Sequence, residues 1–238
     1  MDGNYFGGAL ETCGVVVPYD PLVVTPAIRN AIETNSFEAE EAREIPAIVR
    51  EGDNVLEIGA GIGFISTLLS RQPEVSRVYA IEANPALLPF MADLHAINDV
   101  HKVERLNCVL TNEDITEMTF YQRPDFWMGS LLEGPNPYSS TVTVPTANLD
   151  AFLKEHEINL IVCDIEGAET MIFEGAELAD VDRIYVELHD HVTGLRGVGK
   201  LFRTLAEKGF EYDPRHSCRS VILFQKVGDE DLFRPYAG

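Results

Sequence analysis

The sequence predicts an α/β protein with a mostly parallel β-sheet of about seven strands and helices on both faces. From residue 54 onward, short apolar runs alternate with segments whose apolar residues recur at helical spacing. This alternation is typical of strand–helix–strand units with right-handed crossovers. Near the C-terminus, residues 210–214 and 219–226 form two extended runs that we interpret as an antiparallel hairpin closing the sheet.

Chain length and composition favour one domain spanning residues 1–238. A chain of 238 residues, of which 45% are hydrophobic and 9% aromatic, can bury one substantial core without dividing in two. We divide it into an N-terminal helical cap (1–50) and a core (51–227). Within the core, residues 111–146 are expected to form a lid or substrate-binding insertion.

Charge and cysteine usage narrow the partners and the compartment. The formal net charge is -21, from 39 acidic and 18 basic residues, so nucleic acid and anionic membrane surfaces are unfavourable partners. No apolar run reaches the length of a membrane span, and the N-terminus has no signal-type apolar core. The cysteines show no C-x-x-C spacing and predict buried thiols in a reduced, cytoplasmic compartment: Cys13, Cys108, Cys163 and Cys218.

The N-terminal cap is expected to contain two helices. Thr25-Pro26 is a helix-start signal, and a second helix follows Asn35-Ser36, with apolar positions from Phe37 to Val49. The cap either packs against the edge of the sheet or contacts a ligand, and the sequence does not decide between these.

The core elements follow in alternation. We expect strands at residues 54–58, 77–82, 102–110, 160–166 and 182–189, and helices at 62–71, 85–98, 147–157, 168–178 and 195–208. Residues 111–146 are less regular, with one strand around TFYQ and then a long loop with an edge strand. Loops of this length in a compact domain are usually functional or disordered.

A glycine turn between the first strand and its helix is the strongest cofactor signal. In VLEIGAGIGFIS (55–66) a buried strand, three glycines and a helix start follow one another, which brings bare backbone N–H groups to a ligand. The spacing is acid-x-G-x-G-x-G rather than the G-x-G-x-x-G of dinucleotide-binding turns. It resembles the first motif of class I S-adenosylmethionine-dependent methyltransferases. This cofactor is cationic and carries no phosphate, so the acid suits it. The predicted cofactor-binding residues here are Glu57, Gly59, Ala60, Gly61 and Gly63.

Two further strand ends complete the predicted cofactor pocket. Glu82, in AIEANP, lies roughly 20 residues beyond the glycine turn, where an acid accepts hydrogen bonds from ribose hydroxyls. A nicotinamide-dependent enzyme would also have such an acid, so Glu82, with Ala83 and Asn84, indicates a nucleoside without naming it. Asn107 and Cys108 end the third strand and are expected to face the adenine ring.

The segment from 144 to 176 is the most specific. It contains Leu149-Asp150 before a helix, then D-x-E-G-A-E at 164–169, then Gly175 one helix later. In these features, and in the order of the glycine turn, AIEANP and the V-E-L-H strand, the chain resembles the FkbM family of S-adenosylmethionine-dependent methyltransferases over residues 36–210. The resemblance implies a Rossmann-like fold and O-methylation of a hydroxyl on a sugar, glycan or other natural product.

The candidate catalytic residues lie at the ends of two neighbouring strands. Asp164 and Glu166 point the same way in extended backbone, so one carboxylate is expected to have a raised pKa and to act as a base, and Asp164 also attracts the sulfonium. His189 is a second candidate base. Glu169 is more typical of a helix-stabilising acid. Together with Glu187, these residues could chelate magnesium, but no spacing demands it, and we predict no metal.

The sequence therefore predicts a methyltransferase that converts S-adenosyl-L-methionine to S-adenosyl-L-homocysteine, with a small-molecule or carbohydrate hydroxyl acceptor and in-line methyl transfer. Contacts with that acceptor are expected from Ser130, Tyr138 and Ser139 in the long loop. Other interpretations are methyl transfer to a protein, peptide or other small molecule, a non-catalytic cofactor-binding module, and a nucleotide-dependent oxidoreductase. The acid-x-G-x-G-x-G spacing argues against the oxidoreductase.

Overall fold

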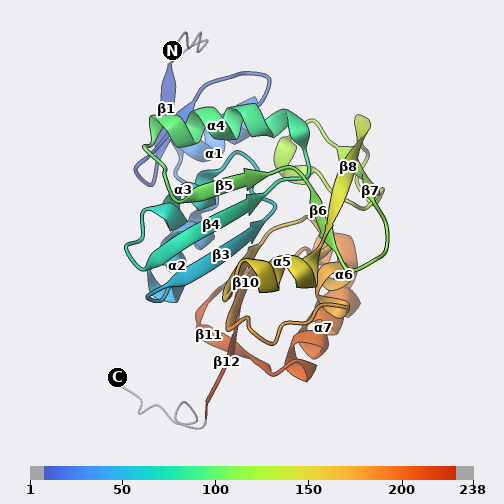
Figure 1. Ribbon diagram of the computed structural model, residues 1–238. Coiled ribbons are helices and arrows are strands. Elements are labelled where there is room, and N and C mark those ends of the chain that lie inside the picture. Colours follow the sequence, from blue (N-terminus) through green and yellow to red (C-terminus); the bar gives the residue numbers. More distant parts are fainter. Residues whose placement is uncertain (1–7, 229–238) are drawn as a thin grey trace.

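The computed structural model describes residues 8–228 (Figure 1). Residues 1–7, which belong to the predicted N-terminal cap, and residues 229–238 lie outside the described part of the chain. A seven-stranded sheet forms the centre, in the order β11-β12-β10-β9-β3-β4-β5. Its strands are β3 (Asp53–Ile58), β4 (Val75–Ile81), β5 (Val103–Leu106), β9 (Leu160–Cys163), β10 (Arg183–Glu187), β11 (Phe210–Cys218) and β12 (Val221–Lys226).

The strand directions confirm the predicted sheet. β3, β4, β5, β9 and β10 are parallel, whereas β12 pairs antiparallel with both β10 and β11. The chain starts the sheet at β3, runs outward to β5 and returns to place β9 on the other side of β3. This reversal between β3 and β9 is a topological switch point, where open α/β sheets bind their ligands.

Both faces of the sheet are covered by helices. Alternate residues of β9 point to opposite faces: Leu160 and Val162 join one core cluster, and Ile161 and Cys163 join the other. The first cluster includes α1 (Pro26–Glu33), α2 (Ala39–Ile48), α3 (Phe64–Ser70) and α4 (Leu88–Ile97). The second includes α5 (Leu149–Glu155), α6 (Glu169–Glu174) and α7 (Asp190–Glu207). The last helix extends the predicted 195–208 toward its N-terminus, with a break at Gly194 (φ 65°).

The N-terminal cap contains a hairpin as well as its two helices. β1 (Ala9–Thr12) and β2 (Val15–Pro18) pair antiparallel, which the sequence patterns did not predict. The Thr25 hydroxyl accepts a hydrogen bond from the N–H of Ile28 (3.4 Å) and caps α1, as the Thr-Pro signal predicted. The next helix starts at Ala39 rather than Phe37, because Glu38 has a left-handed backbone (φ 46°).

The predicted strand 102–110 is wrong as a single strand. The chain leaves the central sheet after Leu106, and β6 (Val109–Thr111) pairs instead with β8 (Ser140–Asn148), which also pairs with β7 (Glu117–Gln122). The cause lies at Asn107, whose side-chain amide donates hydrogen bonds to the carbonyl oxygens of Glu82 (2.8 Å) and Ala83 (3.0 Å). These bonds turn the chain, so the two halves join different sheets.

The segment between β7 and β8 is organised around Arg123. Only 7% of this residue is exposed, and its guanidinium donates hydrogen bonds to backbone carbonyl oxygens of Tyr121, Met128, Leu132, Glu133 and Asn136. The short 3-10 helix η2 (Phe126–Met128) lies within this segment. Whether residues 111–146 act as a lid stays a prediction.

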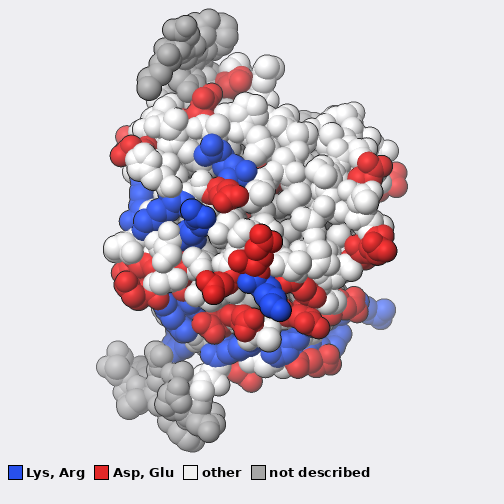
Figure 2. Space-filling view, viewed as in Figure 1, with Lys and Arg blue, Asp and Glu red and all other residues white. Residues whose placement is uncertain are grey.

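The surface charge is mixed on the face shown in Figure 2. Acidic and basic side chains are interleaved across the lower half of this face, so the acidic excess forms no continuous patch there. Among residues 8–228, no helix combines the length and the apolar character needed to cross a membrane.

Candidate functional site

The glycine turn after β3 allows two close backbone approaches. Gly59 has φ 89°, and a Cβ at this position would lie 1.7 Å from the carbonyl oxygen of Asp164. Gly63 has φ 85°, and a Cβ there would lie 2.6 Å from both His95 Nε2 and Met91 Cγ. Only glycine therefore lets β3 approach the end of β9 on one side and α4 on the other.

Glu82 is fixed beneath this turn. It follows the last residue of β4, and its carboxylate accepts hydrogen bonds from the backbone N–H groups of Gly61 (2.7 Å) and Asn84 (2.6 Å). Only 6% of Glu82 is exposed, and this burial raises the pKa of its carboxyl to about 7. The side chain thus connects the turn after β3 to the turn after β4.

A pocket opens in front of these two turns. It is lined by seven of the predicted site residues: Gly59, Gly61, Glu82, Ala83, Cys108, Asp164 and Glu166. Its apolar wall is formed by residues such as Ile81, Leu110, Phe120, Phe126 and Ile172. A mostly apolar cavity with a few convergent polar groups is the usual form of a small-molecule site.

Other predicted cofactor residues lie behind this pocket. Glu57 accepts a hydrogen bond from the N–H of Ser66 (3.1 Å), its Oε2 is buried with no hydrogen-bond partner among the described residues, and burial raises its pKa to about 8. Ala60 packs with Ala80 and Met91. Gly63, Asn84 and Asn107 support the turns, the last two through side-chain hydrogen bonds to backbone groups.

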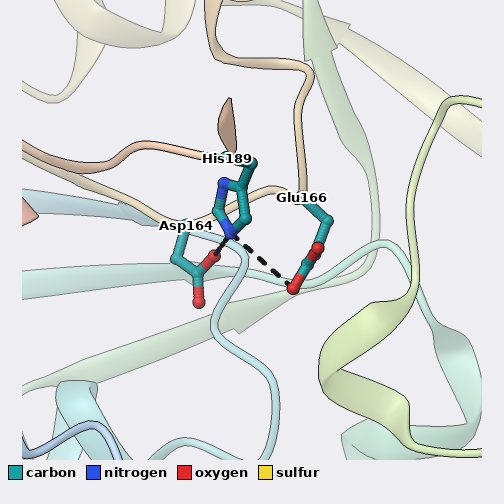
Figure 3. A group of neighbouring side chains, drawn as sticks. All are labelled: Asp164, Glu166 and His189. Carbon is teal, nitrogen blue, oxygen red and sulfur yellow. Dashed lines mark ion pairs between the residues drawn. The ribbon is translucent and has the colours of Figure 1, made fainter. Parts of the chain in front are cut away.

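Asp164, Glu166 and His189 converge at the carboxyl ends of β9 and β10 (Figure 3). Nε2 of His189 lies 3.4 Å from Asp164 Oδ1 and 3.6 Å from Glu166 Oε1. On the other side of the ring, Nδ1 lies 2.6 Å from Oε1 of Glu169, which also accepts the N–H of Gly167 (3.0 Å). The acid that the sequence assigned to the helix therefore also binds the histidine.

Two features hold Glu166 in this cluster. Its backbone is left-handed (φ 51°), which is a strained conformation for a residue other than glycine. Its carbonyl oxygen accepts a hydrogen bond from the hydroxyl of Ser130 (2.8 Å), a residue of the long loop. Ser130 thus acts on the site through the backbone of Glu166. His191 lies 3.8 Å from Glu166 Oε2, but its side chain is 56% exposed.

The pKa values of His189, Asp164 and Glu166 are all raised above their ordinary values. Burial by itself would lower the pKa of His189, but the hydrogen bond to Glu169 and the charges of Asp164 and Glu166 raise it to about 10. Burial raises the pKa of Asp164, as does the nearby charge of Glu187, and burial also raises that of Glu166. In the ligand-free site, His189, Asp164 and Glu166 therefore all retain their protons to a higher pH than usual.

A second cavity, of about 990 Å³ and open to solvent, adjoins the first. Asp164, Glu166, Glu38 and Trp127 line both cavities. The wider cavity also contains Phe37, Glu40, Glu41, Glu187 and Arg219. Burial raises the pKa of Glu41 to about 7 and also raises that of Glu38.

The N-terminal cap therefore lines both cavities, and whether it contacts a ligand there stays a prediction. Glu38, Glu41 and Trp127 were not among the predicted site residues, and the one available signal was that Trp127 is the single tryptophan of the chain. Tyr138 and Ser139 line neither of these two cavities; Tyr138 is 43% exposed, and the Ser139 hydroxyl donates to the Gln122 carbonyl oxygen (3.1 Å).

Comparison with known proteins agrees with this architecture. TYW2 from M. jannaschii in complex with AdoMet is similar in structure, with a TM-score of 0.50 and 14% sequence identity over 95% of this chain and 90% of that one. Precorrin-6y C5,15-methyltransferase from Geobacter metallireducens GS-15 has a TM-score of 0.46 and 13% identity, over 91% of this chain and 94% of that one. No curated protein sequence matches this chain significantly.

The sheet order, the glycine turn and the pocket at the switch point define a Rossmann-like fold of the class I methyltransferases. The methyltransferase FkbM domain matches residues 57–212, which is more than half of the chain. The protein therefore belongs to the FkbM methyltransferase family.

Proposed function

We propose that the protein transfers the methyl group of S-adenosyl-L-methionine to a hydroxyl oxygen of a sugar, glycan or other natural product. The observation that carries this proposal is the shared wall of the two cavities. Asp164 and Glu166 line both the pocket at the glycine turn and the wider acidic cavity, so a cofactor and an acceptor bound in them would meet at these carboxylates.

The first pocket suits the cofactor in each of its parts. Glu82 would accept hydrogen bonds from the ribose hydroxyls, and the backbone at Gly59 and Gly61 would hold the methionine portion. Cys108 and the apolar wall would contact the adenine ring. The carboxylates at one end of the pocket would favour the positive sulfonium. A structurally similar protein, TYW2, forms a complex with AdoMet, which supports this assignment.

The transfer itself would be an in-line displacement. The acceptor oxygen forms a bond to the methyl carbon as the carbon–sulfur bond breaks, and the cofactor leaves as neutral S-adenosyl-L-homocysteine. The hydroxyl proton passes to a carboxylate of the Asp164–Glu166 pair, because a raised pKa makes these carboxylates more basic. His189, whose Nδ1 is bound to Glu169, would position the pair rather than take the proton itself.

The wider cavity favours a hydroxylated, non-anionic acceptor. Carboxylates accept hydrogen bonds from sugar hydroxyls, and Trp127 and Phe37 offer apolar faces to a sugar ring. The same carboxylates, and the net charge of -21, would repel the phosphates of nucleic acid or of a membrane surface. All four cysteines are free thiols, but the prediction that they are buried is wrong for Cys13, which is exposed; a cytoplasmic location stays part of the proposal.

Two measurements test this proposal. In isothermal titration calorimetry, S-adenosyl-L-methionine and S-adenosyl-L-homocysteine should bind, NADPH should not, and Glu82→Ala should weaken both interactions. Radiolabelled methyl transfer to panels of sugars, glycans and peptides should then give alkali-stable ethers. Binding of the nicotinamide cofactor alone would refute the proposal, and alkali-labile product would indicate transfer to a carboxyl group instead.

A further inference from the structure

Three side chains that can each donate to a metal ion converge between the two cavities. Asp164 follows β9 directly, Glu166 lies two residues further on, and His189 follows the neighbouring parallel strand β10. One donor atom from each residue lies within 4.8 Å of the other two. Figure 3 shows the two carboxyl groups and the imidazole ring pointing toward one another. From this geometry we propose that Asp164, Glu166 and His189 bind a divalent metal ion.

The two separations that involve His189 fit coordination to one ion. Two donor atoms that each lie about 2.1 Å from an ion are roughly 3.0–3.5 Å apart at bond angles of about 90–110°. The His189 nitrogen lies 3.4 Å from Asp164 Oδ1 and 3.6 Å from Glu166 Oε1. Small side-chain rotations would therefore place all three donors around a common centre. The wider cavity leaves the remaining coordination positions open to water or to a ligand.

The histidine is oriented as a metal ligand is. Its Nδ1 is bound to Glu169 Oε1 at 2.6 Å, and Glu169 is 3% exposed and further held by the N–H of Gly167. A carboxylate on the far nitrogen of an imidazole fixes the ring and directs the other nitrogen to the metal. With 4% of His189 exposed, the ring has little freedom to turn away.

The cavities that Asp164 lines carry an excess of negative charge. Asp164 Oδ1 is buried and has no hydrogen-bond partner among the described residues, and His189 Nε2, 3.4 Å away, is the charged group beside it. Glu187, Glu38 and Glu41 add three more carboxylates to the cavities that Asp164 lines. Among the described residues that line the wider cavity, Arg219 is the basic one, and it is already paired with Glu40 (2.7 Å). A divalent ion would compensate this excess of negative charge.

The donor set indicates the class of ion. One imidazole and two carboxylates suit ions that accept both nitrogen and oxygen, such as Mn²⁺, Fe²⁺ or Zn²⁺. Placed between the cavities, the ion would bind the acceptor hydroxyl and lower its pKa, as metals do for bound water, and the proton would pass to a carboxylate oxygen of Asp164 or Glu166 that is not bound to the ion. This second role depends on the proposed function, whereas binding of the ion does not.

The test measures Mn²⁺ binding in the absence of cofactor and acceptor. Protein stripped with EDTA is titrated with Mn²⁺, and the free ion is followed by electron paramagnetic resonance. We expect Asp164→Asn and His189→Gln to weaken binding more than tenfold, and Glu169→Gln to weaken it by about 10- to 100-fold. Glu40→Gln is the matched control: it removes a carboxylate of the same cavity outside the cluster and should leave the affinity unchanged.

A measurement on the unmodified protein tests metal binding by His189 even if some variants fail to fold. Pulsed electron paramagnetic resonance of the Mn²⁺ complex should show coupling to a ¹⁴N nucleus from a directly bound imidazole. Absence of this coupling, or equal loss of affinity in Glu40→Gln and Asp164→Asn, would overturn the proposal. The contacts of His189 with Asp164 and Glu166 would then be ion pairs without a metal ion. Titration with S-adenosyl-L-homocysteine reports separately on the proposed function.

Discussion

Gly59 and Asp164 touch through their backbones: a β-carbon on Gly59 would stand 1.7 Å from the Asp164 carbonyl oxygen. Replacing Gly59 by alanine must therefore separate β3 from β9, in addition to straining a positive φ. Gly52 provides a matched control, because it also has a positive φ (87°) but no atom within 4 Å of the place a β-carbon would occupy. We expect Gly59→Ala to lose about 1–3 kcal/mol more unfolding free energy than Gly52→Ala in urea titrations. Equal losses would show that the contact gives way at no cost.

Cofactor affinity should depend on the protonation of Glu82. Its pKa of about 7 means that the carboxyl becomes protonated, and loses acceptor capacity for ribose hydroxyls, as the pH falls below 7. We expect S-adenosyl-L-homocysteine to bind more weakly at pH 6 than at pH 8. Glu82→Gln should bind about tenfold or more weakly at pH 8, with a flatter pH profile. The exposed Glu104→Gln serves as the control and should follow the unmodified protein. If the affinity of Glu82→Gln for S-adenosyl-L-homocysteine changed with pH as much as that of the unmodified protein, the pH dependence would belong to another group.

His95 should lower the unfolding free energy of the protein in acid. This histidine is 1% exposed, contacts the Ser66 hydroxyl (3.1 Å) and the Gly63 carbonyl oxygen (3.2 Å), and has a pKa that burial lowers to about 4. Between this value and the ordinary value of 6.5, the unfolded chain binds a proton that the folded protein does not. His95 therefore contributes a loss of stability of up to about 3 kcal/mol as the pH falls through this range, whereas the raised pKa values of Glu41, Glu57 and Glu82 contribute with the opposite sign.

The measurement is the unfolding free energy between pH 4 and pH 8. Relative to the unmodified protein, His95→Gln should gain stability as the pH falls from 8 to 4, whatever its stability at pH 8. His101→Gln is the matched control, since the His101 side chain is 78% exposed. The same slope in the unmodified protein and both variants would contradict the assignment to His95.

The buried ion pair between Asp53 and Arg183 should be a large determinant of stability. Both guanidinium NH₂ groups donate to the carboxylate (2.7 and 3.0 Å), and the side chains are 1% and 2% exposed. Asp53→Ala leaves a buried, unpaired guanidinium and should cost about 3–5 kcal/mol. Glu33→Ala, which breaks the exposed pair with Arg29, should cost less than about 1 kcal/mol. Thermal unfolding compares the two; similar losses would show that Arg183 finds another partner.

Local patterns were enough to predict seven of the residues that line the pocket at the glycine turn. The glycine turn and Glu82 lie at the ends of successive strands, and the parallel sheet brings such ends together. Asp164, Glu166 and His189 were predicted for the same reason, because β9 and β10 are neighbours. In each case the side chain lies at the end of a strand, so its spacing along the chain predicts where it lies in the sheet.

Tertiary contacts decided what the sequence could not show. Both halves of residues 102–110 have the pattern of a strand, and the break between them depends on Asn107 bonding to carbonyl groups of another turn. Glu169 fitted a helix-start pattern, but its partner His189 lies 20 residues further along the chain. Glu38 and Trp127 come from a cap and a loop whose contact with the sheet has no periodic signature.

Arg123 has a consequence for how acceptor preference can change. Its guanidinium donates hydrogen bonds to main-chain carbonyl oxygens of the loop, and every amino acid has such an oxygen. These hydrogen bonds therefore do not depend on which side chains the bonded residues carry. Trp127, on the same loop, lines the cavity proposed for the acceptor. Substitution at the bonded positions would therefore leave these hydrogen bonds in place, whereas Trp127 is also held by stacking on Phe37 of the cap, with ring centroids 6.2 Å apart.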